Sequence, residues 1–139
     1  MKPQKQAFFH KPDEGIYGDC TRTVFACLLD MERDAVPHFG AGSPPHHVRS
    51  EHERQWLASQ NLVEVSVAYE GDRDAILCTF GAQNTGLHYM LTGRSRTGCH
   101  HVVICRNHLI VWDTSIDDAG IIGPCDNGYY CISVLAKKL

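Results

Sequence analysis

The stretch from Tyr17 to Met31 constrains the fold most, because a turn, a helix start and a cysteine follow one another directly. Gly18 and Asp19 form a turn signal, and apolar residues then recur at helical spacing at Val24, Cys27, Leu28 and Met31. Asp19 is predicted as the N-cap, which places Cys20 in the first helical turn. There the positive end of the helix dipole and unpaired backbone N–H groups favour the nucleophilic thiolate. We therefore expect an amphipathic helix, ending near Met31, with a candidate nucleophile at its start.

The other cysteines favour a more ordinary interpretation of the thiols. The chain has 7 cysteines, an odd number. The segment Met1–Gln6 is basic but has no apolar stretch behind it, so it does not read as a secretory signal. Reduced thiols in a cytoplasmic protein are the simplest expectation. Most free cysteines are small buried apolar residues, and Cys20 has that alternative too unless partners activate it.

Length and charge limit the class of protein. The 139 residues suit one domain, predicted to span residues 1–139. A net charge of −3 offers no electrostatic footprint for nucleic acid or an anionic membrane. No apolar run approaches the roughly 20 residues of a membrane span. We therefore predict neither nucleic acid nor membrane as a partner.

The second half of the chain is rich in strand patterns. Alternating or β-branched runs predict strands at 62–69, 88–92, 101–105, 109–112 and 129–135, and a further short edge strand is predicted at 7–10. The run 74–80 fits either a helix or a strand. In the first half, Ser50 and Glu53 form a predicted capping box for a helix through Gln60, and the loop 40–45 is a candidate flap. Helices followed by strands favour an α+β fold, with the cysteine-bearing helix packed on a mostly antiparallel sheet.

Two further residues complete a candidate triad. His100 begins one predicted strand, and Asp113 ends the next strand of the same hairpin. Antiparallel partners around a short turn place these two ends side by side, so Asp113 is predicted to accept a hydrogen bond from the His100 ring. His100 would then act as general base and acid toward Cys20. By strand alternation, His101 is predicted to lie on the opposite face.

The chain resembles the papain-like cysteine peptidase superfamily, most closely small phage and bacterial proteins similar to bacteriocin leader-processing peptidases. Three parts carry the resemblance, which covers roughly residues 10–123. They are Gly18-Asp19-Cys20 with Leu28-Leu29 and Val36-Pro37-His38-Phe39; Gly93-Arg94-Ser95-Arg96-Thr97-Gly98-Cys99-His100-His101-Val102-Val103; and the hairpin strand Leu109-Ile110-Val111-Trp112-Asp113. The resemblance implies a papain-like fold and a Cys20–His100–Asp113 triad.

The same resemblance implies a thiol hydrolase that cleaves a peptide or amide bond of a peptide or protein substrate without a cofactor. Two features depart from the family pattern. No Gln lies between Ala7 and Cys20, where relatives often carry a Gln that helps to bind the oxyanion. Thr114-Ser115-Ile116 follows Asp113, where relatives tend to have Pro-His-Pro.

Three alternatives remain open. A zinc site could draw on Cys99, His100, His101 and Cys105, but neighbouring strand residues point to opposite faces and no Cys-x-x-Cys pair exists, so no metal is predicted. The papain-like shell could instead be a catalytically idle module that binds and modulates a host protein. An acyl transferase or deamidase would use the same triad and differ only in the acceptor.

Overall fold

The chain forms three α-helices, two short 3-10 helices and a five-stranded antiparallel sheet, which confirms the predicted α+β class. The computed structural model describes residues 1–139. In chain order the elements are η1 (Pro12–Glu14), α1 (Cys20–Leu28), η2 (Arg33–Ala35), α2 (His46–Ser59), β1 (Leu62–Tyr69), α3 (Arg73–Gln83), β2 (His88–Arg94), β3 (His100–Arg106), β4 (Leu109–Asp113) and β5 (Tyr130–Lys137). None of the helices combines the length and apolar character that crossing a membrane requires.

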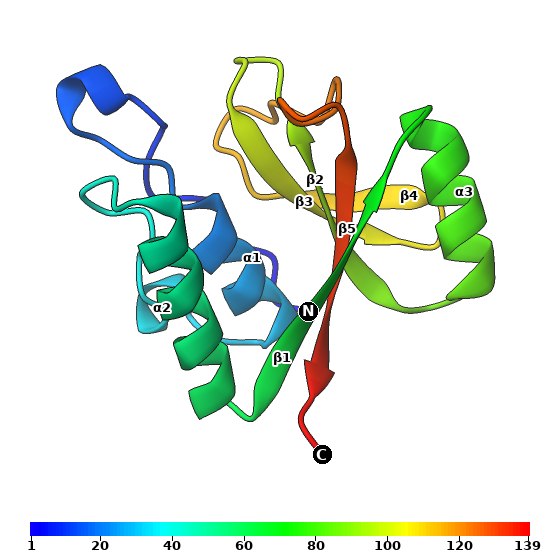
Figure 1. The fold of residues 1–139 in the computed structure, drawn as a ribbon, viewed down its shortest axis with the longest axis horizontal. Coiled ribbons are helices and arrows are strands. Elements are labelled where there is room, and N and C mark those ends of the chain that lie inside the picture. The colour runs from blue at the N-terminus through cyan, green and yellow to red at the C-terminus, as the bar shows by residue number, and fades with distance from the viewer.

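The strands are ordered β1-β5-β2-β3-β4, so the last strand of the chain lies inside the sheet (Figure 1). β1 pairs with β5 along its whole length, from Leu62 opposite Lys137 to Tyr69 opposite Tyr130. β2, β3 and β4 follow one another as antiparallel hairpins. This topology puts β4 at one edge of the sheet, next to the strand that carries the candidate histidines.

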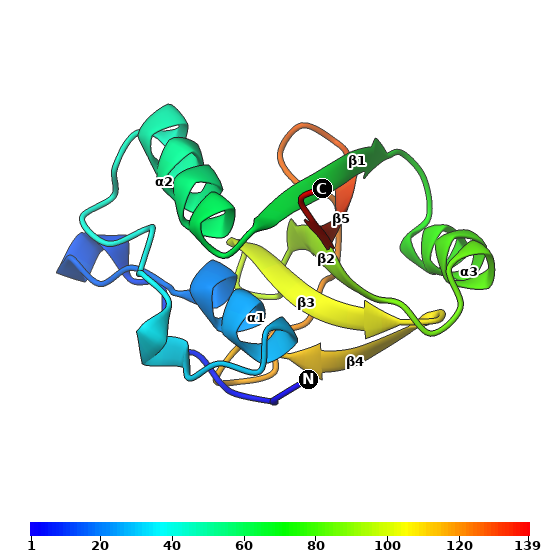
Figure 2. The ribbon, with the colours of Figure 1, turned by 90° about the horizontal axis from the view of Figure 1, so that it is seen from below.

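Helices cover both faces of the sheet (Figure 2). Successive strand residues face opposite sides, so each strand supplies both cores. One core joins α1 and α2 to Met90, Val102 and Ile104. The other joins α3 to the alternate residues of the same strands, among them Tyr89, Leu91, Val103 and Cys105.

Aromatic contacts fix α2 against α1. The rings of Phe25 and Trp56 are stacked, with centroids 6.2 Å apart and planes 4° apart, and Phe39 meets Trp56 edge-on. Val24, Cys27 and Leu57 are almost completely buried in the same core. The apolar face predicted for the first helix is therefore the buried one, and Trp56 and Leu57 of α2 pack against it.

Some predicted boundaries differ from the structure. α1 ends at Leu28 rather than near Met31, and the segment 7–10 forms no strand. The ambiguous run 74–80 lies within α3, because the Asp72 carboxylate accepts a hydrogen bond from the Ala75 N–H (2.9 Å) and caps that helix.

The predicted capping box of the second helix is wrong. α2 begins at His46, with Pro45 at its N-cap position and no side-chain cap. Glu53 instead binds Arg49 one helical turn earlier, at 2.8 Å. A proline can start a helix because its missing N–H is not needed there, so the helix extends one turn upstream of Ser50.

Candidate active site

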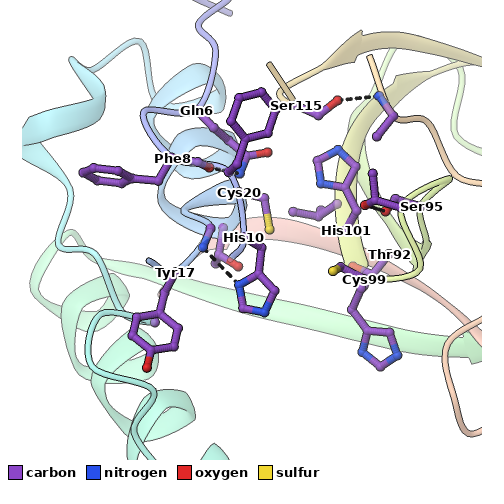
Figure 3. A pocket seen from close by; sticks show the side chains of 18 of the residues that line it. Gln6, Phe8, His10, Tyr17, Cys20, Thr92, Ser95, Cys99, His101 and Ser115 are labelled. Atoms are coloured by element: carbon purple, nitrogen blue, oxygen red, sulfur yellow. Dashed lines mark hydrogen bonds between the residues drawn. The ribbon is translucent and has the colours of Figure 1, made fainter. Parts of the chain in front are cut away.

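A cleft of about 890 Å³ opens at the start of α1 (Figure 3). The N-terminal segment, α1 and α2 supply one wall, and β2, β3 and the loops after β2 and β4 supply the other. Cys20 and His101 both line this cleft. The loop 40–45, predicted as a candidate flap, borders it through Gly40, Ser43 and Pro44. The cleft therefore contains both a candidate nucleophile and an imidazole.

Cys20 is the first residue of α1, as predicted, and its side chain is partly buried. Figure 3 shows its sulfur, from α1, pointing into the cleft that His101 enters from β3. α1 is held against β3 by the packing of Val24 and Phe25 on Val102 and Ile104. The helix start is thus fixed beside the start of the strand.

The imidazole that meets Asp113 belongs to His101. Its Nε2 lies 2.7 Å from Oδ1 of Asp113, and only 6 % of the His101 side chain is exposed. With Nε2 donating to the carboxylate, Nδ1 is the ring nitrogen that remains for the thiol. The structure therefore brings together Cys20, His101 and Asp113.

His100, the residue predicted for this position, lies elsewhere. Half of its side chain is exposed, and its Nε2 accepts a hydrogen bond from the backbone N–H of Asp126 at 3.1 Å. It also lies 3.4 Å from the Asp126 carboxylate, at the rim of the cleft. The expected His100–Asp113 contact is absent, and the expectation that His101 faces away from the site is corrected.

A β-bulge explains the exchange of the two histidines. Next to the turn of the β3–β4 hairpin, Cys105 pairs with Ile110, and continuing that register would place Asp113 opposite Val102, on the face that His100 shares. The register instead shifts after Cys105, because Val111 is an extra residue in β4, and Asp113 pairs with Val103. A one-residue shift moves a side chain to the other face of the strand. Asp113 consequently shares a face with His101.

The Asp113 carboxylate is held by the segment that follows it. Oδ1 accepts hydrogen bonds from the backbone N–H (2.9 Å) and hydroxyl (2.7 Å) of Ser115, and Oδ2 accepts one from the N–H of Gly120 (2.8 Å). The Ser115 hydroxyl also accepts from the N–H of Ala119 at 2.7 Å. Thr114-Ser115-Ile116 departs from the family pattern in sequence, yet in this chain it anchors the carboxylate that orients His101.

The three groups shift one another's pKa values. Burial alone raises the pKa of the Cys20 thiol, but the adjacent imidazole of His101 and its charge outweigh burial and lower that pKa below its ordinary value. Burial lowers the pKa of His101, but the hydrogen bond to Asp113 and the adjacent Cys20 sulfur outweigh burial and raise that pKa to about 9. Burial likewise raises the pKa of Asp113, whereas its hydrogen bonds to His101, Ser115 and Gly120 bring it well below its ordinary value. Both shifts act toward a Cys20 thiolate beside a His101 imidazolium.

α2 contributes a positive charge to the thiol. The charge of Arg49 and the hydroxyl of Thr21 both help to lower the pKa of Cys20. Arg49 donates to Oγ1 of Thr21 at 2.8 Å and is itself held by Glu53. The guanidinium therefore ties α2 to the first turn of α1 and places its charge near the sulfur.

Potential donors to an oxyanion lie at the same end of the cleft. The first N–H groups of a helix have no acceptor within it, and the Asp19 side chain, at the N-cap position, makes no cap hydrogen bond, which corrects the predicted capping role. The Cys20 N–H has no backbone acceptor in the chain and is therefore available. Gln6 lines the same cleft (Figure 3), and a Cβ added to Gly18 would come within 3.4 Å of its Nε2. A glutamine amide is therefore present just upstream of the segment in which the sequence showed none.

The residues considered for zinc do not converge on one point. No group of three or more His, Cys, Asp or Glu side chains is arranged to hold a metal ion. His101 is engaged by Asp113, His100 binds the Asp126 backbone, and Cys105 is buried in the core beneath α3. Three of the four candidates thus lie in three different surroundings.

Sequence reasoning missed His101, Gln6 and Ser115 for different reasons. Nothing in Leu109–Asp113 indicates that Val111 forms a β-bulge. The sequence therefore could not predict on which face of the strand the Asp113 side chain lies. Gln6 reaches the cleft because its N–H binds the carbonyl of Thr114, a contact across more than a hundred residues. Ser115 had a signal, because a Ser two residues after an Asp is a common turn partner of its carboxylate.

Comparison of the chain with protein-family models, curated proteins and solved structures gave no match.

Proposed function

We propose that this protein is a papain-like thiol hydrolase that cleaves a peptide or amide bond. One observation carries the proposal: a thiol of lowered pKa at a helix start shares a cleft with a buried imidazole that a carboxylate orients at 2.7 Å. Nucleophile, base and orienting group in this order are the signature of covalent acyl transfer. Cys20 is the nucleophile, His101 is the general acid and base, and Asp113 orients His101.

The chemistry follows from the favoured protonation state. The Cys20 thiolate attacks the carbonyl carbon, a C–S bond forms, and the carbonyl electron pair moves onto oxygen. His101 then gives its proton to the leaving amine as the C–N bond breaks, which leaves a thioester. Neutral His101 removes a proton from water, the water oxygen attacks the thioester carbon, and the acid product leaves as Cys20 regains its thiolate. Asp113 stabilises the imidazolium at each stage.

Two donors suit the negative oxygen of the intermediates. The backbone N–H of Cys20 is one, since the nucleophile and this N–H belong to the same residue at the start of α1. The side-chain amide of Gln6 is the other, because it lines the cleft next to Gly18 and an amide group has two N–H donors. One of these reaches the carbonyl of Phe8 at 3.3 Å, and the second is free for a substrate.

Acyl-enzyme formation tests the proposal without knowledge of the natural substrate. The probe is p-nitrophenyl acetate, whose aryl ester transfers an acetyl group to a reactive thiol and releases nitrophenolate. We expect a burst of nitrophenolate equal to the protein concentration, followed by slower turnover, and an acetyl group on Cys20 in the mass spectrum. The Cys20→Ala and His101→Gln variants should show neither.

Cys78, which is exposed, serves as the control thiol within the same molecule. Acetylation of Cys20 no faster than that of Cys78 would contradict the proposal. An acetyl group that forms quickly on Cys20 but passes to added amines rather than to water would instead identify an acyl transferase.

A further inference from the structure

Asp19 is a buried acid that the proposed chemistry does not use. Its side chain has no exposed surface, although it lies next to the proposed nucleophile in the chain. It does not cap α1. A carboxylate in such a place needs partners, because burying an unpaired charge is costly. Its partners show what it does.

The Asp19 carboxylate binds the N-terminal segment. Oδ1 accepts hydrogen bonds from the backbone N–H groups of Ala7 and Phe8, both at 3.1 Å, and Oδ2 lies 3.2 Å from the Ala7 nitrogen. Arg22, one turn into α1, donates to Oδ2 at 2.9 Å and neutralises the charge. The carboxylate thus joins residues 7 and 8 to the first turn of the helix.

These bonds fix the backbone on one side of Gln6. On its other side, the Gln6 N–H donates to the carbonyl of Thr114 at 2.8 Å, next to Asp113. Hydrogen bonds therefore connect the backbone around Gln6 to the loop that holds Asp113 and to the helix that carries Cys20. The segment has no helix or strand hydrogen bonds of its own, so these contacts determine where the Gln6 side chain lies.

We propose that Asp19 is a positioning residue: its carboxylate holds residues 7 and 8 so that the Gln6 amide faces the oxyanion formed on attack by Cys20. This role rests on the proposed hydrolase function. It makes Asp19 part of the oxyanion site without contact between Asp19 and the substrate.

Two reactions of the same thiol separate this role from a general structural one. Acetylation by p-nitrophenyl acetate passes through an oxyanion, whereas alkylation by iodoacetamide is a displacement at a saturated carbon and needs no oxyanion donor. The pKa of Cys20 is lowered by His101, Arg49 and Thr21, which the variants below leave in place. Loss of oxyanion donors should therefore slow the first reaction and spare the second.

The test compares Asp19→Asn with Gln6→Ala and with the double variant. We expect each single change to slow acetylation of Cys20 by up to about 10²-fold, the effect of one lost oxyanion donor, while the alkylation rate stays within about twofold of the wild type. The double variant should be no slower than Gln6→Ala, because Asp19 acts through Gln6. Asp34→Asn is the matched control, since Asp34 also faces Arg22 (3.7 Å) but has an exposed side chain and no hydrogen bond to residues 6–8.

A second variant covers the case in which Asp19→Asn does not fold. Ala7→Pro removes one N–H that the carboxylate accepts and leaves the buried charge with Arg22 and Phe8. It should slow acetylation and spare alkylation in the same way. Equal slowing of both reactions, or an undiminished effect of Asp19→Asn in the Gln6→Ala background, would overturn the role of Asp19. Absence of Cys20 acetylation in the wild-type protein would overturn the proposed function, and this role with it.

Discussion

Two cysteines on opposite sides of the sheet differ in what surrounds the thiol. Cys105, on β3 beneath α3, is fully buried among apolar side chains, and burial raises its pKa to about 12. Cys20, at the start of α1, is partly buried in the wall of the cleft, and burial opposes its ionisation too. The difference is that Cys20 meets His101, Arg49 and the Thr21 hydroxyl. Access to the cleft and partners that stabilise the anion together separate a candidate nucleophile from an inert thiol.

The same contrast extends to the two cores. The α3 side is built from apolar side chains packed on Tyr89, Leu91 and Val103. The α1 side ends in a cleft where buried polar groups hold one another, and no buried side-chain nitrogen or oxygen lacks a partner. A dry core supplies stability, and a satisfied polar network at its edge supplies fixed geometry for chemistry.

The largest expected effect is the difference in acetylation rate between substitutions of His101 and of His100. His101→Gln should lower Cys20-dependent acetylation by on the order of 10³-fold or more, because it removes the base and the charge beside the thiol. His100→Gln should leave the rate within about threefold, since His100 faces Asp126. The double change Cys20→Ala with His101→Gln should be no worse than Cys20→Ala alone. A dominant effect of His100→Gln would restore the assignment expected from the sequence.

Asp113→Ala should have the next largest effect. We expect acetylation to fall by about 10²-fold and not to vanish, because His101 keeps its place in the cleft but loses the group that orients it. Asp117→Ala, in the same loop region but with an exposed surface pair to Arg96, is the control. Burst amplitude and rate with p-nitrophenyl acetate measure both. An Asp113→Ala variant with the wild-type rate would reduce Asp113 to a structural residue.

Replacing sulfur by oxygen should order the buried cysteines by their surroundings. Cys105→Ser should lower the free energy of unfolding by about 1–3 kcal/mol, because its hydroxyl would have no partner under α3. Cys27→Ser should cost less, because the Gln4 carbonyl lies 3.7 Å from its sulfur and can accept. Cys20→Ser should cost least. Urea unfolding of the three variants gives the order, and the reverse order would mean that these surroundings do not determine the cost of the substitution.

The smallest expected effect is on the stability of the protein at acid pH. The pKa of Asp113 is lowered by folding, so its contribution to stability is present above pH about 4, the unfolded value, and is lost as the pH falls further. Between pH 5 and pH 2, the free energy of unfolding should fall in both proteins. The fall should be smaller in Asp113→Asn than in the wild type by on the order of 1 kcal/mol. Parallel unfolding curves for both proteins across this range would show that the Asp113 network contributes no such term.

The sequence specified more of the fold than of the site. Helical spacing and β-branched runs are local, so α1, β1 and the β3–β4 hairpin were predicted close to their observed bounds. The site depends on a β-bulge and on long-range contacts that local sequence patterns do not encode. Val111 bulges out of the hairpin and exchanges His100 for His101, and Asp19 binds residues 7 and 8 instead of capping its own helix. The residue types of the site were predictable, but the face of one strand and the path of the N-terminal segment were not.

The pH dependence of Cys20 alkylation tests the central claim most directly. Iodoacetamide labelling of each cysteine, followed by mass spectrometry from pH 4 to pH 10, reports the thiolate fraction of Cys20 with Cys78 as the reference within the same molecule. The account predicts a midpoint for Cys20 clearly below the value of about 8.5 for an ordinary thiol, and an upward shift of that midpoint in His101→Gln. A midpoint at or above that value, or one that His101→Gln leaves unchanged, would contradict the thiolate–imidazolium pair.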